Sequence, residues 1–231
     1  MCSPPWRGRH GSSPVGSELP AFELHCPLLS LPRALKTRID TIPAAQGYLH
    51  ADAAKVAKWR SRLEAYRGPR IGLAWSGNPQ HSHDRVRSIP LADLLAGLPT
   101  NFHYVSLQKE LRDLDARTLH ARADVLDLRS ELHDFGDTAA LCRNLDLVIS
   151  IDSAVAHLSA ALGQPTWLLL PFHPDWRWLT ERSDSPWYRS ARLFRQSRPG
   201  RWDEPVALVS RELVSRFAQS LSSSSARAGT A

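Results

Sequence analysis

The residues best suited to chemistry lie in the stretch ISIDSAVAHLSAALGQPTWLLLP (149–171). An apolar run ends at Asp152, and Ser153 then has the type and position of a helix N-cap. A helix that starts there presents unpaired backbone N–H groups and a partial positive charge, which suit a phosphate group. Ala154 keeps the first turn slim. His157 follows Ser153 by four residues, so it lies on the same helical face and can reach the same ligand.

This stretch has two other interpretations. An ordinary crossover helix, in which Ser153 only caps the helix and His157 fills a gap, fits the pattern equally well. A nucleophilic triad of Asp152, Ser153 and His157 is disfavoured, because the G-x-S-x-G elbow is missing. A serine and a histidine on adjacent turns of one helix also seldom form a productive triad.

A second candidate stretch, AWSGNPQHSHDRVRSIPL (74–91), follows a predicted strand. Turn-forming residues around Asn78 are followed by a group of basic side chains: His81, His83, Arg85 and Arg87. The stretch matches neither the Walker A motif nor G-x-G-x-x-G. Arginine binds phosphate in a bidentate manner, so the loop indicates anion capture. The HxHD pattern alone is more typical of a solvated loop than of a metal site, and we expect neither metal nor cofactor.

Two further stretches offer binding groups. In PFHPDWRWLTERSDSPWY (171–188), tryptophans and tyrosine mix with charged residues. These rings either stack on a base or sugar, or pack a small core of their own. Gln108 and Lys109 directly follow another predicted strand, where they would meet a ribose or phosphate. A solvated loop is the alternative for that pair.

Short apolar runs alternate with helical segments from residue 70 onward. Strands are predicted at 70–75, 102–107, 124–128, 146–151, 165–170 and, at the sheet edge, 191–196. Helices are predicted at 51–66, 90–98, 109–121, 135–145, 153–163 and 205–217. The alternation predicts a doubly wound, Rossmann-like α/β fold with a mostly parallel sheet. Ligands bind beyond the carboxyl ends of such strands, which selects the same loops without any motif.

The composition of the 231 residues, 42% of them hydrophobic, is ordinary for a globular protein. We expect a disordered leader (1–18), a linker arm with a helix (19–68), the Rossmann-like domain (69–219) and a disordered tail (220–231). No apolar run approaches the ~20 residues that a membrane span needs. The first residues lack the apolar region of a secretory signal. The three cysteines form no CxxC pair, so a reducing, cytoplasmic location is expected.

The chain carries a net charge of +6. This charge suits anionic partners, among them phosphorylated small molecules. Nucleic acid is disfavoured, because the basic residues are dispersed and no nucleic-acid-binding signature is present.

Several stretches resemble the glycosyltransferase family 9 (heptosyltransferase-like) group, in its branch linked to tetratricopeptide repeats. The resemblance covers about residues 22–217. It is carried by DLVISIDSAVAHLSAALGQPTWLLLPF, the most specific stretch, and by IGLAWSGNPQHSHDRVRSIPL, YVSLQK, DFGDTAAL, PDWRW, DSPWY and LFRQ. It implies a GT-B architecture, in which two Rossmann-like domains face each other and the C-terminal one holds a nucleotide-diphosphate sugar. It also implies inverting transfer without a metal.

The resemblance implies roles for individual residues. Arg87 stands where heptosyltransferases place a phosphate-binding lysine, and His157 lies beside the diphosphate, so these two are the catalytic candidates. The substrate-binding candidates are Asn78, Gln108, Lys109, Asp137, Thr138, Asp152, Ser153 and Ala154. Among them, Gln108 or Lys109 would meet the ribose, and Asp137 with Thr138 would border the base.

Two departures from the family pattern bear on activity. Ala154 stands where many heptosyltransferases have glycine, whose missing Cβ allows closer approach to the ligand. Most of the N-terminal domain, which binds the acceptor and supplies the general base, has no counterpart in this sequence. We therefore expect a donor-binding half with little turnover alone and an exposed face for self-association or a protein partner. A truncated, non-catalytic nucleotide-sugar-binding or protein-interaction module is the alternative.

Overall fold

The computed structural model describes residues 16–18, 21–44 and 46–228, with side chains as far as Gln219. The chain divides into two compact units, Met1–Thr41 and Ile42–Ala231. In the described part of the first unit there are only short helical turns, none with a buried residue: η1 (Leu28–Ser30), α1 (Leu31–Ala34) and η2 (Ile39–Thr41). The predicted leader, 1–18, lies outside the described residues except for 16–18.

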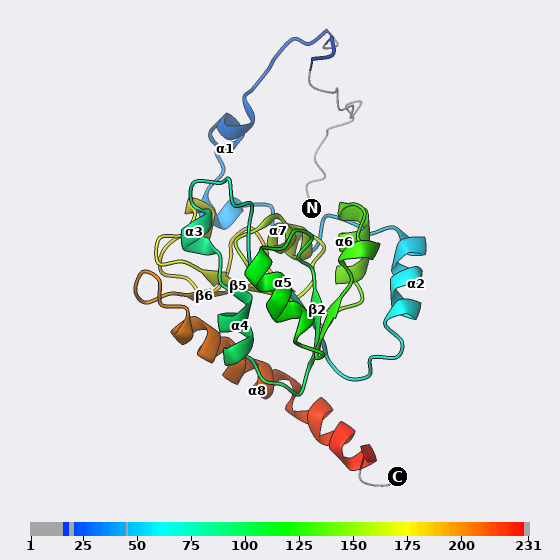
Figure 1. The fold of residues 1–231 in the computed structure, drawn as a ribbon. Coiled ribbons are helices and arrows are strands. Elements are labelled where there is room, and N and C mark those ends of the chain that lie inside the picture. The colour runs from blue at the N-terminus through cyan, green and yellow to red at the C-terminus, as the bar shows by residue number, and fades with distance from the viewer. Residues whose placement is uncertain (1–15, 19–20, 45, 229–231) are drawn as a thin grey trace. The chain divides into compact units, whose positions relative to one another are not determined.

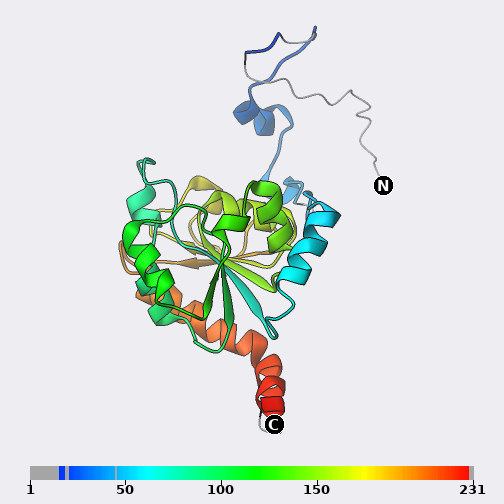
Figure 2. The ribbon, with the colours of Figure 1, turned by 45° about the vertical axis from the view of Figure 1, so that its right-hand side comes forward.

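In the second unit, the described strands form one parallel sheet in the order β3-β2-β1-β4-β5-β6 (Figures 1 and 2). The strands are β1 (Arg70–Ala74), β2 (His103–Ser106), β3 (Val125–Asp127), β4 (Leu147–Ile151), β5 (Thr166–Leu170) and β6 (Ala191–Arg195). The predicted Rossmann-like α/β fold is confirmed, with β6 at the edge as expected. The strand order reverses between β1 and β4, which is the switch point where doubly wound folds bind ligands.

Helices cover both faces of the sheet, which explains why its strands are continuous apolar runs. Every residue of β4 and β5 is buried. One face packs against α4 (Leu91–Gly97), α5 (Asp113–His120) and α8 (Asp203–Ala228). The other face packs against α2 (Ala53–Arg62), α6 (Phe135–Cys142) and α7 (Ala154–Ala161). Side chains alternate between the two faces along β4, with Ile149 on the first and Val148 on the second.

The sheet-bearing unit begins earlier than predicted, at Ile42 rather than at residue 69. Helix α2, assigned from sequence to the linker arm, packs against α6 and buries Trp59 completely. Asp52 caps α2 by accepting a hydrogen bond from the Lys55 backbone nitrogen at 2.8 Å. The apolar stripe of this helix was visible in the sequence, but the surface that it covers is formed by residues much later in the chain.

Helix α8 also runs further than predicted, to Ala228. The segment 218–228 contains neither glycine nor proline, so nothing in its sequence breaks the helix. The remainder of the predicted tail, 229–231, lies outside the described residues. No helix in the described part of the chain has both the length and the apolar character needed to cross a bilayer.

We predict that Trp59→Ala lowers the free energy of unfolding by about 3–5 kcal/mol, because it opens a large cavity between α2 and the sheet. The matched control is Trp176→Ala, since Trp176 is 59% exposed, and its effect should be much smaller. Urea denaturation of both variants measures the difference. Equal effects would contradict the inclusion of α2 in the core.

Candidate functional site

The two stretches selected from sequence meet at the switch point of the sheet. Strand β1 leads into the loop that ends at α3 (Asp84–Arg87), and its neighbour β4 leads directly to Asp152 and α7. Arg87 Nη1 donates a hydrogen bond to the Asp152 carbonyl oxygen at 2.9 Å, across 65 residues of sequence. Parallel pairing of β1 with β4 therefore holds a guanidinium beside the start of a helix.

Helix α7 begins as the sequence predicts, with Ser153 as its N-cap. The Ser153 backbone is extended (φ −146°, ψ 166°), and its Oγ accepts from the Ala156 backbone nitrogen at 3.4 Å. Ser150 Oγ lies 3.0 Å from Ser153 Oγ and helps to fix the cap. The cap uses one of the N–H groups of the first turn, and the partial positive charge of the helix start remains.

Two cavities meet at this point. The larger, here the β6-side cavity, has a volume of about 1000 Å³ and extends along the carboxyl ends of β5 and β6. The smaller, the β2-side cavity, has about 590 Å³ and extends toward β2 and α6. Both are lined by Arg87, Ser153 and Ala154. The guanidinium and the helix start thus lie where one ligand could extend into both cavities.

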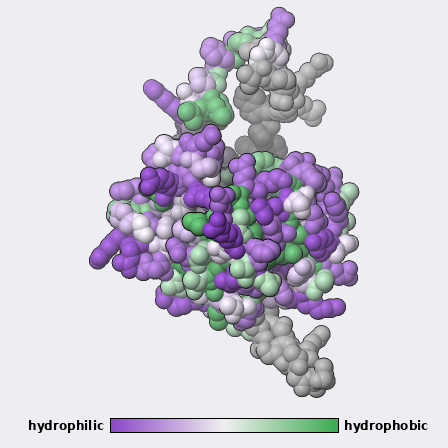
Figure 3. All heavy atoms as spheres, in the orientation of Figure 1, coloured by the Kyte–Doolittle hydropathy of each residue, from purple (hydrophilic) through white to green (hydrophobic). Residues whose placement is uncertain are grey.

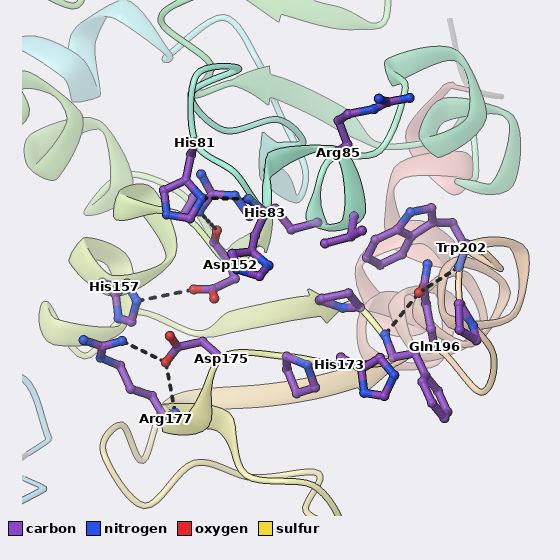
Figure 4. A pocket seen from close by; sticks show the side chains of 18 of the residues that line it. His81, His83, Arg85, Asp152, His157, His173, Asp175, Arg177, Gln196 and Trp202 are labelled. Carbon is purple, nitrogen blue, oxygen red and sulfur yellow. Dashed lines mark hydrogen bonds and ion pairs between the residues drawn. The ribbon is translucent and has the colours of Figure 1, made fainter.

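Asp152 and His157 face each other in the β6-side cavity (Figure 4). His157 Nε2 lies 3.4 Å from Asp152 Oδ1, and its Nδ1 lies 3.0 Å from the Tyr188 hydroxyl. The His157 ring also stacks on Trp178, with centroids 5.1 Å apart. Burial alone would raise the pKa of Asp152, but His157, the Trp178 indole and Arg87 favour the carboxylate and hold the pKa below its ordinary value. Burial and the neighbouring Tyr48 raise the pKa of Tyr188.

Gln108 and Lys109 line the β2-side cavity, but backbone groups occupy their polar atoms. Gln108 Oε1 accepts from the backbone nitrogens of Trp75 (3.3 Å) and Ser76 (3.1 Å), and its Nε2 donates to the Ser76 oxygen at 2.9 Å. Lys109 Nζ donates to two backbone oxygens, those of Arg129 and Leu132. In this structure both side chains support the loops around the cavity.

Asn78 and Thr138 also line the β2-side cavity, whereas Asp137 lines neither cavity. The buried Asp137 carboxylate pairs with Lys55 Nζ at 3.0 Å and accepts from the His133 backbone nitrogen at 3.1 Å. Burial would raise the pKa of Asp137, but these two hydrogen bonds hold it below its ordinary value. The Asp137 carboxylate therefore joins α6 to α2, and the acidic residues that line the β2-side cavity are Glu110 and Asp134.

The residues that position Arg87 were not predicted from the sequence. Asp84 is buried, lies 3.5 Å from Arg87 Nε, forms an ion pair with Arg112 and accepts from Ser88 Oγ at 3.0 Å. A Cβ at Gly77 would collide with the Arg87 guanidinium and lie 2.6 Å from Asp84 Oδ1, so a larger residue there would displace these side chains. The i, i+3 spacing of Asp84 and Arg87 was a usable signal. No local pattern pointed to Arg112.

The tryptophan-rich stretch mainly packs its own core. Trp178, in η4 (Trp176–Trp178), is completely buried, and Trp187 Nε1 donates to the Arg177 oxygen at 2.9 Å. Asp175 caps η4 and pairs with Arg177 at 2.8 Å, and both side chains line the β6-side cavity.

The HxHD pattern does not assemble a metal site. His83 donates its backbone N–H to His81 Nδ1 at 3.2 Å, so a local hydrogen bond uses one ring nitrogen of the pair. Among residues 16–18, 21–44 and 46–228, no group of three or more histidine, cysteine or acidic side chains is arranged to hold a metal ion.

No family model matches the chain. A curated relative, Protein FlbA of Caulobacter vibrioides, is 27% identical over 190 residues. The matched region is 78% of this chain and 31% of FlbA, so the chain spans about a third of that relative's length.

Two solved structures are similar to the chain. One is the ADP-heptose LPS heptosyltransferase II of E. coli, with a TM-score of 0.50 and 18% identity over 77% of this chain and 54% of that protein. The other is a glycosyl transferase family 9 protein of Veillonella parvula DSM 2008, with a TM-score of 0.48 and 12% identity over 75% and 52% of the two chains. The chain therefore has the Rossmann-like α/β fold that makes up about half of the E. coli heptosyltransferase structure.

Proposed function

We propose that this chain is the donor-binding domain of a GT-B glycosyltransferase and binds a nucleoside-diphosphate sugar. The proposal rests on the hydrogen bond that joins Arg87 to the Asp152 carbonyl oxygen at the start of α7. This contact lies between two cavities at the switch point of the sheet. Helix starts and arginine side chains are the two groups that proteins use most readily to bind phosphate.

The charge balance around Arg87 supports diphosphate binding. Asp84 is shared by Arg87 and Arg112, which leaves one net positive charge in this group. Arg87 Nε faces Asp84 at 3.5 Å and Nη1 donates to the Asp152 carbonyl oxygen, so within the described residues Nη2 keeps donor capacity for an anion. A charge-assisted arginine contact contributes about 1.5–3 kcal/mol. A helix start adds about 0.3–1 kcal/mol, or up to ~2 when partly buried.

We assign the nucleoside and the sugar of the donor to different cavities. The nucleoside would occupy the β2-side cavity, beside Asn78 and Thr138, and the sugar would enter the β6-side cavity, beside Asp152 and His157. During transfer, an acceptor hydroxyl gives its proton to a general base of the acceptor-binding domain and attacks the anomeric carbon from the opposite face, while the bond to the diphosphate breaks. Arg87 and the α7 start then stabilise the negative charge that develops on the leaving diphosphate. This chemistry requires no metal and inverts the anomeric configuration.

The proposal has a non-catalytic alternative for the whole protein. The chain spans about half of the E. coli structure and a third of FlbA, so the same donor site also suits a non-catalytic nucleotide-sugar-binding or interaction module. For either form of the whole protein, the proposal also includes linkage to tetratricopeptide repeats, a cytoplasmic location, and a protein partner or self-association. On the face shown in Figure 3, hydrophobic residues are interspersed among hydrophilic ones. Sugar transfer by the purified chain would decide for the catalytic version.

We predict that Arg87→Ala weakens binding of a nucleoside diphosphate by roughly 10- to 100-fold, since it removes a charge-assisted contact. Isothermal titration calorimetry with ADP, UDP, GDP and dTDP measures the affinity. Arg87→Lys keeps the positive charge but lacks the planar guanidinium that binds phosphate in a bidentate manner, so its loss of affinity should be intermediate.

The matched control is Arg117→Ala, because the exposed Arg117 side chain on α5 lines neither cavity. This variant should bind as the unaltered protein does. Equal affinities of the Arg87→Ala and unaltered proteins would remove Arg87 from the site. Failure of all four diphosphates to bind would refute the proposed function.

We further predict opposite effects of Ala154→Glu on stability and on binding. A carboxylate in the first turn of α7 interacts favourably with the helix dipole, so the melting temperature should stay the same or rise. The same carboxylate lies where both cavities meet and repels a diphosphate, so affinity should fall at least tenfold. Thermal denaturation and calorimetry measure the two effects. Unchanged affinity in a folded variant would contradict phosphate binding at this helix start.

A further inference from the structure

Gln196, the residue directly after β6, is only 4% exposed and borders the β6-side cavity. Its Oε1 accepts hydrogen bonds from the backbone nitrogens of Phe172 (3.1 Å) and Gly200 (3.3 Å). Both partners are donors, so the amide oxygen must face them. The orientation of the Gln196 amide is therefore fixed by its neighbours, and its NH₂ group must point the other way.

The Gln196 NH₂ group has no structural partner. Nε2 is buried and makes no hydrogen bond within the described part of the chain. Figure 4 shows the amide nitrogen on the side of the Trp202 ring. A buried donor without an acceptor is costly, and such groups in native proteins call for an explanation. The carbonyl oxygen alone holds the two loops, so that structural role does not use the NH₂ group.

The position of Gln196 relates it to the proposed diphosphate site. Strands β4, β5 and β6 are consecutive parallel neighbours. Adjacent strands lie about 4.8 Å apart, so the end of β6 lies about 10 Å from the end of β4, where α7 begins. This separation suits a sugar ring attached to a phosphate at the α7 start, whose far side would then reach Gln196.

The surroundings of Gln196 also suit a sugar. Trp202 and Phe172 contribute aromatic surface to the cavity wall, and Pro171 and Pro199 contribute apolar surface. Sites for small polar ligands typically combine such surfaces with a few placed hydrogen-bonding groups. A neutral amide donor among apolar rings matches a hydroxyl oxygen better than it matches a second phosphate, for which a cation would be expected.

We propose that Gln196 Nε2 donates a hydrogen bond to a hydroxyl oxygen of the transferred sugar and is a specificity-determining residue of the β6-side cavity. The inference rests on the proposed function, because the diphosphate at α7 sets where the sugar lies. Gln196 contributes to recognition of the sugar and contributes nothing to recognition of the nucleoside diphosphate.

The test compares each nucleoside diphosphate with its sugar conjugates in the full chain and in Gln196→Glu. Glutamate has the same shape and keeps the acceptor for Phe172 and Gly200, but it replaces the NH₂ donor by an oxygen. Calorimetry would use ADP, UDP, GDP and dTDP with their glucose conjugates, together with UDP-galactose, UDP-N-acetylglucosamine and GDP-mannose. Gln196→Met, which also lacks the donor, is the second variant in case the buried carboxylate impairs folding. Thermal denaturation identifies the folded variants.

In the unaltered protein, at least one sugar conjugate should bind more tightly than its nucleoside diphosphate. The folded Gln196 variant should bind that conjugate roughly tenfold more weakly, with unchanged affinity for the nucleoside diphosphate. The inference is overturned if no conjugate exceeds its diphosphate in affinity, or if the variant keeps the full difference. Failure of every diphosphate to bind the unaltered protein instead refutes the underlying donor site, which separates the two failures.

Discussion

The parallel pairing of β1 with β4 is the constraint on which the rest of the site depends. Ala74 lies opposite Ser150 in the register, so both strands end at the same edge of the sheet, and the chain must leave them side by side. The loop after β1 then returns Arg87 to the carbonyl of Asp152. Gly77 leaves room for the Arg87 guanidinium in this position, because a Cβ there would collide with it. Pairing, loop and helix start together form the arrangement to which we assign diphosphate binding.

Fixed charges around this arrangement are balanced within the chain. Asp84 is buried, but two arginines contact it, which meets the requirement that a buried charge be paired. Asp152 lies against His157 and stays ionised because its neighbours outweigh the effect of burial. Positive and negative groups thus alternate from Arg112 through Asp84 and Arg87 to Asp152. A charged ligand would meet groups already held in place, with little reorganisation to oppose binding.

A polar side chain beside a cavity is not necessarily available to a ligand. Gln108 shows this clearly, because its amide continues the hydrogen bonding of β1 beyond the last strand residue. Lys109 similarly binds two backbone oxygens, and Asp137 binds Lys55. Gln196 differs from these residues, since its oxygen is occupied while its nitrogen is buried without a partner. A residue whose polar atoms bind other parts of the chain supports the structure, whereas a residue with an unused buried donor is a candidate ligand contact.

The features that could be predicted from the residue pattern are local: the alternating strands and helices, and the Ser153 cap at the end of an apolar run. These features depend on residues within a turn or two of each other, so the pattern of neighbours contains them. Three features became visible only in the folded structure. Helix α2 belongs to the sheet domain, Asp137 pairs with Lys55, and the buried Gln196 NH₂ group has no acceptor within the described residues. Each of these depends on partners brought together by packing over long stretches of chain, and residue spacing in one sequence carries no record of such contacts.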